Sequence, residues 1–170
     1  MKRTCGQCSG RMPVTARADA RFCSGACRQK AYRARRSGVP ACMRGLRRWV
    51  RADGKRPIRP DGRWASSTKP FTWSSFAEVQ SGAGDGFGVM LGGGLGCWDL
   101  DDCFDAGGRL EGWAVAALDG VVPVFAERSV SGRGLHVFVE AVEGPGCRGG
   151  GVEFYSRDRF IRVTGDRFDL

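Results

Sequence analysis

Histidine, tyrosine and lysine are scarce in this sequence of 170 residues, which contains one, two and four of them respectively. A single histidine excludes a zinc-protease site and a two-histidine nickase site, because each of these needs two imidazoles. The sequence also contains no Gly-x-Ser-x-Gly turn and no Gly-x-x-x-x-Gly-Lys loop. These absences exclude the hydrolases that use that turn and the nucleotide-binding proteins that use that loop.

Long apolar runs are absent as well. No stretch approaches the roughly 18 apolar residues of a membrane-spanning helix, and Lys2 and Arg3 are not followed by the apolar stretch of a signal peptide. We therefore expect a cytoplasmic protein with no membrane partner. In that compartment the eight cysteines are expected to be metal ligands and free thiols rather than disulfides.

The basic residues are concentrated in the first part of the chain. Residues 1–64 contain 18 Lys and Arg and three acidic residues, a net charge of +15, whereas residues 65–170 carry a net charge of −6. Such a division predicts an arm that binds a polyanion, most simply nucleic acid, beside a globular part that holds cations.

The apolar pattern predicts an α+β fold. A chain of this length can form one substantial core with a small appendage. Strand candidates, separated by glycine-rich turns, cover residues 87–91, 96–100, 121–127, 135–140, 152–155 and 160–164, and residues 110–118 place apolar side chains on one stripe of a helix. Strands with few helices favour the α+β class.

Four of the cysteines form two closely spaced pairs, Cys5 with Cys8 and Cys23 with Cys27, and 14 residues separate the pairs. Two such pairs can bind one zinc ion tetrahedrally, although a disulfide or a coincidental spacing is the alternative. We predict a four-cysteine zinc-binding module over residues 1–36 that ends in a basic helix over 27–36, followed by a basic linker over 37–48. The other cysteines, which lack this spacing, are expected to be buried free thiols: Cys42, Cys97, Cys103 and Cys147.

Acidic residues and the single histidine occupy strand positions that can share a face. Asp99 and Asp101 alternate with apolar neighbours, Glu153 lies in another strand, and His136 follows a Gly-Arg-Gly turn. Carboxylates in this arrangement can hold divalent ions, and the turn can bring backbone N–H groups close to phosphate. The pattern indicates metal-assisted phosphate chemistry. An ordinary acidic strand end is the alternative.

The order of these segments resembles that of the primase-polymerases of the archaeo-eukaryotic primase superfamily, in the version that phages and plasmids encode. The resemblance rests on Trp73-Ser-Ser-Phe76 and on residues 86–91, 96–102, 127–136 and 152–165. It implies an RRM-like catalytic core with a mixed or antiparallel sheet over residues 49–170. The cysteine module resembles small zinc fingers that accompany many unrelated domains.

The resemblance also implies roles for individual residues. Asp99, Asp101 and Glu153 would bind catalytic Mg²⁺ or Mn²⁺, and His136 would contact the phosphates of the incoming nucleotide. Arg133 and Arg159 would help to hold the triphosphate, while Ser131 would either bind phosphate or shape the turn. The activity implied is that of a DNA-dependent nucleotidyltransferase, a primase and DNA polymerase of DNA replication.

The implied partners are single-stranded or primer-template DNA and nucleoside triphosphates. Members of the family usually continue with helical segments and often with a helicase, so we expect the core to be truncated at its C-terminus and completed by a separate helicase or C-terminal polypeptide. Two alternatives stay open: a catalytically inactive zinc-finger accessory protein that binds nucleic acid, and a metal-dependent nuclease that uses the same acids.

Overall fold

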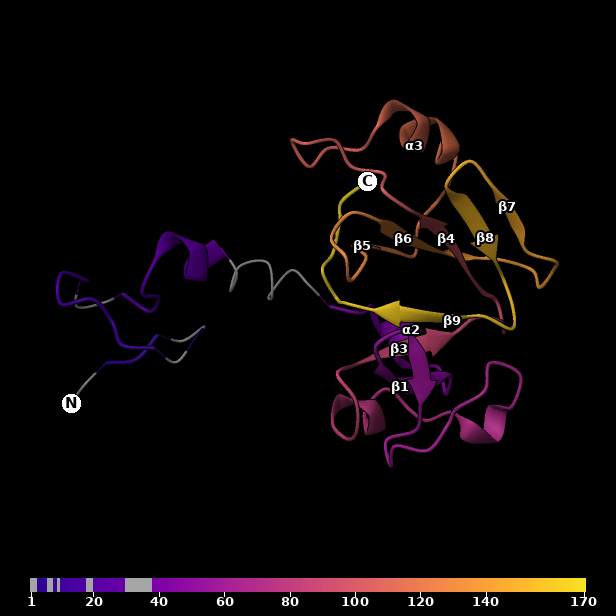
Figure 1. Ribbon diagram of the computed structural model, residues 1–170, viewed down its shortest axis with the longest axis horizontal. Coiled ribbons are helices and arrows are strands. Elements are labelled where there is room, and N and C mark those ends of the chain that lie inside the picture. The colour runs from indigo at the N-terminus through magenta and orange to yellow at the C-terminus, as the bar shows by residue number, and fades with distance from the viewer. Residues whose placement is uncertain (1–2, 6–7, 9, 18–19, 30–37) are drawn as a thin grey trace. The chain divides into compact units, whose positions relative to one another are not determined.

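The computed structural model describes residues 3–5, 8, 10–17, 20–29 and 38–170, and the chain divides into two compact units, Met1–Gly38 and Val39–Leu170 (Figure 1). In the first unit, Thr4 and Arg11 form an isolated β-bridge. Residues 25–29 are helical, and the Ser24 hydroxyl accepts a hydrogen bond from the Cys27 N–H at 3.1 Å, as an N-cap does. The rest of the predicted basic helix lies outside the described residues.

The second unit contains two antiparallel sheets. The four-stranded sheet has the order β2-β1-β3-β9, and the five-stranded sheet has the order β5-β6-β4-β8-β7. The strands are β1 (Trp49–Asp53), β2 (Arg56–Ile58), β3 (Gly86–Met90), β4 (Leu95–Leu100), β5 (Phe125–Arg128), β6 (Leu135–Glu140), β7 (Cys147–Gly149), β8 (Val152–Tyr155) and β9 (Phe160–Val163). The predicted α+β class with an antiparallel sheet is confirmed.

Helices are few and short in the second unit. They are α2 (Ala41–Arg44), α3 (Gly112–Ala117) and two 3₁₀ turns, η1 (Pro70–Thr72) and η2 (Glu78–Gln80). The predicted helix over 110–118 corresponds to α3. The strand predicted over 121–127 begins only at Phe125, because Pro123 has no N–H to contribute to a sheet.

Two apolar cores hold the second unit together. One lies between the sheets and includes Trp49, Val89 and Ile161 from the four-stranded sheet and Cys97 and Phe138 from the five-stranded sheet. The other covers the opposite face of the five-stranded sheet and is closed by α3 (Figure 1). The five-stranded sheet is therefore buried on much of both faces.

Residues 39–48, which the sequence assigned to a linker, lie in the second unit. Val39 and Met43 are 6% and 1% exposed and belong to the core between the sheets. The Trp49 indole N–H donates to the Met43 carbonyl at 3.0 Å. Apolar residues interspersed among the arginines of this stretch therefore fix α2 against the sheet.

No helix in the described ranges is long and apolar enough to cross a membrane.

Candidate functional site

A row of ionisable residues crosses the five-stranded sheet from one edge strand to the other. Glu127 of β5 pairs with His136 of β6, which pairs with Asp99 of β4. Asp99 pairs in turn with Glu153 of β8, and Glu153 pairs with Arg148 of β7. Directly opposed residues of antiparallel strands place their side chains on the same face, here the face that also carries Cys97 and Phe138. The candidate site thus borders the core between the sheets.

Asp99 lies near the centre of this row. Its Oδ1 is 3.6 Å from His136 Nε2, and its side chain is 21% exposed. Burial raises the pKa of Asp99 above its ordinary value; the charges of Asp101 and Glu153 add to this, and those of His136 and Arg159 oppose it. A divalent cation would relieve the cost of holding these carboxylates ionised together.

Asp101 lies beyond the end of β4, in a turn, and is exposed. Its N–H donates to the Gly151 carbonyl at 3.0 Å, so the turn adjoins the segment that leads into Glu153. Within the described residues, the only group of three or more candidate ligands whose atoms all lie within 4.8 Å is formed by cysteines. Asp99 and Glu153 are therefore neighbours in the sheet and Asp101 lies in the adjoining turn, and the three acids do not form a closed cluster.

Glu153 is surrounded by groups that compensate its charge. Tyr155 donates its hydroxyl proton to Glu153 Oε2 at 2.6 Å, and burial together with this bond raises the pKa of Tyr155. Arg148 and Arg159 form ion pairs with Glu153 at 3.6 and 3.5 Å, and the Arg159 guanidinium lies 4.5 Å from the centre of the Tyr155 ring. The structure thus brings Arg159, a residue expected to bind nucleotide, next to the acids.

The Gly-Arg-Gly turn brings Ser131 and Arg133 to the end of the sheet where Asp101 lies. The Ser131 hydroxyl accepts the Arg133 N–H at 3.2 Å, and Arg133 Nε donates to Asp102 Oδ1 at 2.7 Å. Gly134 is required here, because a Cβ on it would lie 2.7 Å from the Leu100 carbonyl oxygen. In this structure Ser131 shapes the turn, and Arg133 is held beside the turn that follows β4.

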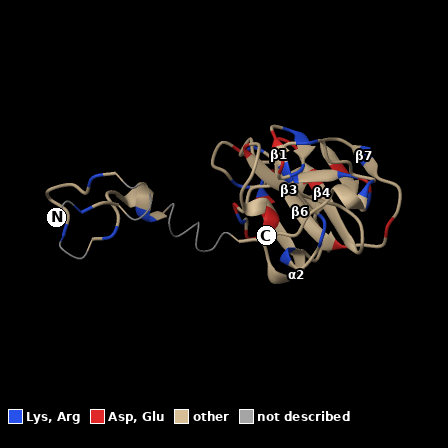
Figure 2. Ribbon diagram, turned by 90° about the horizontal axis from the view of Figure 1, so that it is seen from below, with Lys and Arg blue, Asp and Glu red and all other residues tan. Residues whose placement is uncertain are grey.

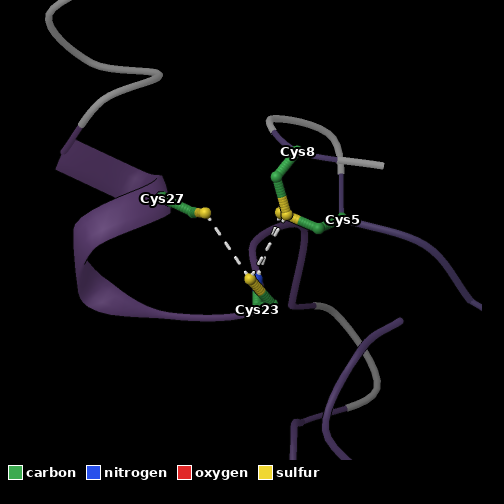
Figure 3. A group of neighbouring side chains, drawn as sticks. All are labelled: Cys5, Cys8, Cys23 and Cys27. Atoms are coloured by element: carbon green, nitrogen blue, oxygen red, sulfur yellow. Dashed lines mark hydrogen bonds between the residues drawn. The ribbon is translucent and has the colours of Figure 1, made fainter. Parts of the chain in front are cut away.

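The four cysteines of the first unit lie together, as predicted (Figure 3). The Sγ atom of Cys23 is 3.7 Å from that of Cys8 and 3.5 Å from that of Cys27. Tetrahedral zinc with bonds of about 2.3 Å requires sulfur atoms roughly 3.8 Å apart. Hydrogen bonding to the thiols of Cys27, Cys5 and Cys8, together with burial, raises the pKa of Cys23 to about 12. The four thiols could bind a metal ion such as zinc, which would displace their protons.

The remaining cysteines are free thiols, but only two of them are buried. Cys97 and Cys103 lie in the cores, as expected, whereas Cys42 and Cys147 are exposed. The expectation of burial was wrong for the latter two because Cys42 is on the outer side of α2 and Cys147 is on β7, an edge strand whose residues are all exposed.

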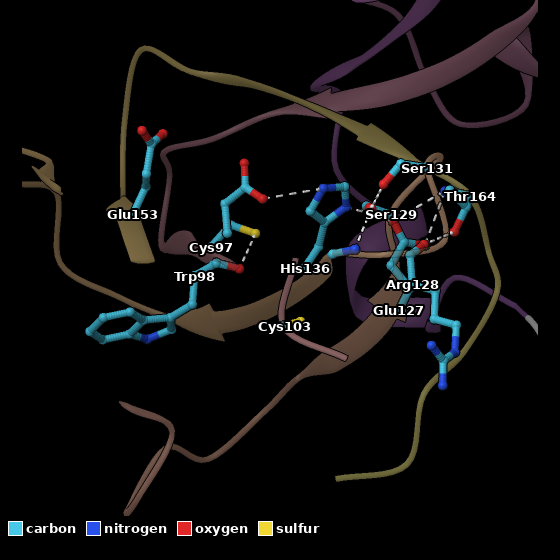
Figure 4. A network of polar contacts seen from close by, with 12 residues as sticks. Cys97, Trp98, Cys103, Glu127, Arg128, Ser129, Ser131, His136, Glu153 and Thr164 are labelled. Carbon is cyan, nitrogen blue, oxygen red and sulfur yellow. Dashed lines mark hydrogen bonds and ion pairs between the residues drawn. The ribbon is translucent and has the colours of Figure 1, made fainter. Parts of the chain in front are cut away.

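Glu127 is the site residue that the sequence reasoning missed. Its side chain is fully buried, and its carboxylate accepts hydrogen bonds from the Thr164 N–H at 3.1 Å and the Gly165 N–H at 2.7 Å. Its Oε1 is also 3.3 Å from His136 Nδ1 (Figure 4). One sequence signal could have identified it: Glu127 lies two residues after Phe125 in a strand, so the acid is on the same face as this apolar core residue.

Two of the acids, Asp99 and Glu153, and the single histidine thus lie side by side on one face of the five-stranded sheet. In sequence, the chain is 32% identical to the DNA primase-polymerase of Nitratiruptor phage NrS-1, over 132 residues that cover 69% of this chain and 18% of that protein. This similarity supports the relationship to phage primase-polymerases that the motifs indicated. The chain spans less than a fifth of the length of that relative. No family model matches the chain.

Proposed function

We propose that the second unit is the catalytic core of a primase-polymerase, of the RRM-like type that the motifs imply. It would act as a nucleotidyltransferase that adds nucleotides to a growing strand on a DNA template. The observation that carries this proposal is the row in which Asp99 is flanked by His136 on one side and Glu153 on the other. The similarity to a phage primase-polymerase supports it.

In this proposal Asp99, Asp101 and Glu153 hold Mg²⁺ or Mn²⁺. When bound, the metal would lower the pKa of the attacking 3′-hydroxyl and neutralise charge on the triphosphate. The raised pKa of Asp99 supports the assignment, since its burial and the neighbouring carboxylates disfavour a lone negative charge there. The carboxylates would fix the position of the ions beside the nucleotide.

Basic side chains on either side of the acids would bind the nucleotide. His136 presents Nε2 towards Asp99, where it can donate to a phosphate oxygen when the ring is protonated at that nitrogen. Arg159 borders the acids, and Arg133 is 75% exposed on the turn. Charge-assisted bonds from these groups would stabilise the negative charge that develops on pyrophosphate as it leaves.

Replacing His136 by alanine is expected to raise the apparent KM for nucleoside triphosphate about tenfold, the effect of losing one hydrogen bond to a charged group. DNA affinity should change by less than about twofold, because the imidazole is buried beside the acids rather than on the exterior. Steady-state incorporation kinetics and DNA-binding titrations measure the two effects. A larger loss of DNA affinity than of nucleotide affinity would contradict the assignment.

We further propose that the first unit binds the DNA backbone. The described part of this unit carries arginines and no acidic residue (Figure 2), and residues 1–38 together contain ten basic residues and one acidic residue. Contacts between these side chains and phosphates would release counterions.

In the second unit, Trp64 is 69% exposed and Arg56 lies 5.7 Å from its ring centre, an arrangement on which a base could stack.

Removing residues 1–38 is expected to weaken binding to single-stranded DNA and to flatten its salt dependence. The slope of log affinity against log salt should fall by about 0.7 for each phosphate that the truncated protein no longer neutralises. The truncation ends at 38 because Val39 and Met43 belong to the core of the second unit. Titrations at several salt concentrations measure the slope, and circular dichroism checks the fold. An unchanged slope would show that the first unit does not bind the DNA backbone.

Extension of a primed template with labelled nucleotides tests the proposed activity against its alternatives. A primase-polymerase lengthens the primer in a template-directed manner, a nuclease shortens DNA, and an accessory protein does neither. The absence of both nucleotide binding and incorporation, with Mg²⁺ or Mn²⁺, would favour the accessory protein.

We also propose that a separate helicase or C-terminal polypeptide assists the core.

A further inference from the structure

We infer that Glu127 is a positioning residue that holds the imidazole of His136 in the orientation in which Nε2 faces the acids and the nucleotide phosphates. This inference rests on the proposed function for its catalytic consequence. Its structural part, the bond between Glu127 and the Nδ1–H group of His136, can be tested without any activity.

The surroundings of Glu127 hold its carboxylate in place. Its side chain is 0% exposed, and an ionised carboxylate in such a place is costly unless hydrogen bonds compensate it. Thr164 and Gly165, which follow β9 of the other sheet, donate both of their backbone N–H groups to it. These donors make Glu127 an acceptor of fixed position, since neither the strand nor the β9 segment can rotate away.

The carboxylate of Glu127 also faces the imidazole of His136. Both backbone donors approach Oε2, and the Thr164 N–H is shared with Oε1. Oε1 also faces His136 Nδ1 at 3.3 Å. An ionised carboxylate only accepts hydrogen bonds, so in the proposed arrangement Nδ1 carries the proton and donates it to Oε1. The other ring nitrogen, Nε2, then lies on the side of Asp99, at 3.6 Å from its Oδ1.

Glu127, His136 and Asp99 are directly opposed on three neighbouring strands, so strand pairing alone sets their spacing. An imidazole without Glu127 could turn about its side-chain torsions and present a different nitrogen or edge. A carboxylate behind a functional histidine fixes the orientation of its ring. His136 is therefore held from behind by Glu127 while its Nε2 faces the acids.

The single histidine of the chain makes the bond directly observable. In wild-type protein at neutral pH, ¹⁵N-edited NMR should show one imidazole set whose Nδ1 is protonated, with a downfield Nδ1–H resonance that exchanges slowly. In Glu127→Gln this resonance should disappear or shift upfield. Glu140→Gln provides the matched control, because Glu140 is an exposed carboxylate on the strand that carries His136. A wild-type Nδ1 without a proton, or a signal unchanged in Glu127→Gln, would overturn the inference.

Kinetics then separate positioning from general stabilisation. Glu127→Gln should raise the apparent KM for nucleotide about fivefold with kcat changed less than about twofold, and adding it to His136→Ala should change KM by less than about twofold, since coupled residues are non-additive. If the effects of Glu127→Gln and His136→Ala on KM instead multiply in the double variant, Glu127 acts independently of His136, through packing alone. If wild-type protein incorporates no nucleotide, the proposed function fails, whereas the NMR result still decides whether Glu127 holds His136. Should Glu127→Gln not fold, the wild-type Nδ1–H signal and its coupling across the hydrogen bond decide the same point.

Discussion

Asp99→Asn is expected to abolish template-directed nucleotide incorporation, by at least about a thousandfold, while the protein stays folded. An amide has half the oxygen ligands of a carboxylate and no charge, so it cannot hold the proposed divalent ions between Asp101 and Glu153. Losing preorganised charge stabilisation at the reacting phosphate typically costs a factor of this size. Primer-extension rates with Mg²⁺ or Mn²⁺ measure the loss.

Although Asp99→Asn loses activity, it should make the metal-free protein more stable near neutral pH. Because burial raises the pKa of Asp99 in the folded chain, its ionised form destabilises the fold. This cost is absent below the ordinary aspartate pKa and grows as the pH rises through the raised value. Without metal, the melting temperature of Asp99→Asn should therefore equal that of wild type at acidic pH and exceed it near neutral pH.

Added divalent metal should reverse this order. Mg²⁺ or Mn²⁺ that binds only the folded site raises the melting temperature of wild type by mass action, and Asp99→Asn should lose this response. Asp119→Asn is a suitable control, because Asp119 is an exposed acid in the turn after α3. Normal incorporation by Asp99→Asn, or an equal metal response in both proteins, would show that Asp99 is not a metal ligand.

The strand alternation around the acids was readable from the sequence. Apolar neighbours of Asp99, His136 and Glu153 predicted strands and the side of each strand on which the polar groups lie. The cysteine spacing likewise predicted a cluster that the structure brings together. Local patterns of this kind predict structure from sequence because they depend only on backbone periodicity and on short loops.

Register and long-range contacts were not readable in the same way. That Asp99 is opposed to both His136 and Glu153 depends on how β6 and β8 align with β4, which no local pattern specifies. Glu127 was missed because its partners, Thr164 and Gly165, lie 37 and 38 residues away in sequence. The stretch 39–48 looked like a linker because its arginines masked Val39 and Met43, whose burial requires the completed sheet.

Cys23→Ser is expected to remove the metal from the first unit and to unfold that unit. Among the described residues of Met1–Gly38, the buried apolar side chains are Cys5 and Met12, too few to offset the entropy of ordering the chain. Four thiolates bound to zinc would supply the missing free energy, on the order of 10 kcal/mol for small zinc modules.

Metal analysis of the purified wild-type chain should give about one zinc per molecule, and Cys23→Ser should retain almost none. Hydrogen exchange of residues 1–38 should become fast in the variant, while exchange in the second unit should not change, because the variant leaves its cores intact. Cys42→Ser removes an exposed thiol on α2 and should leave both readouts as in wild type. Since thiolates must lose their protons to bind zinc, affinity should fall as the pH is lowered. A first unit that stays protected from exchange in the presence of a strong chelator would mean that its fold does not depend on metal.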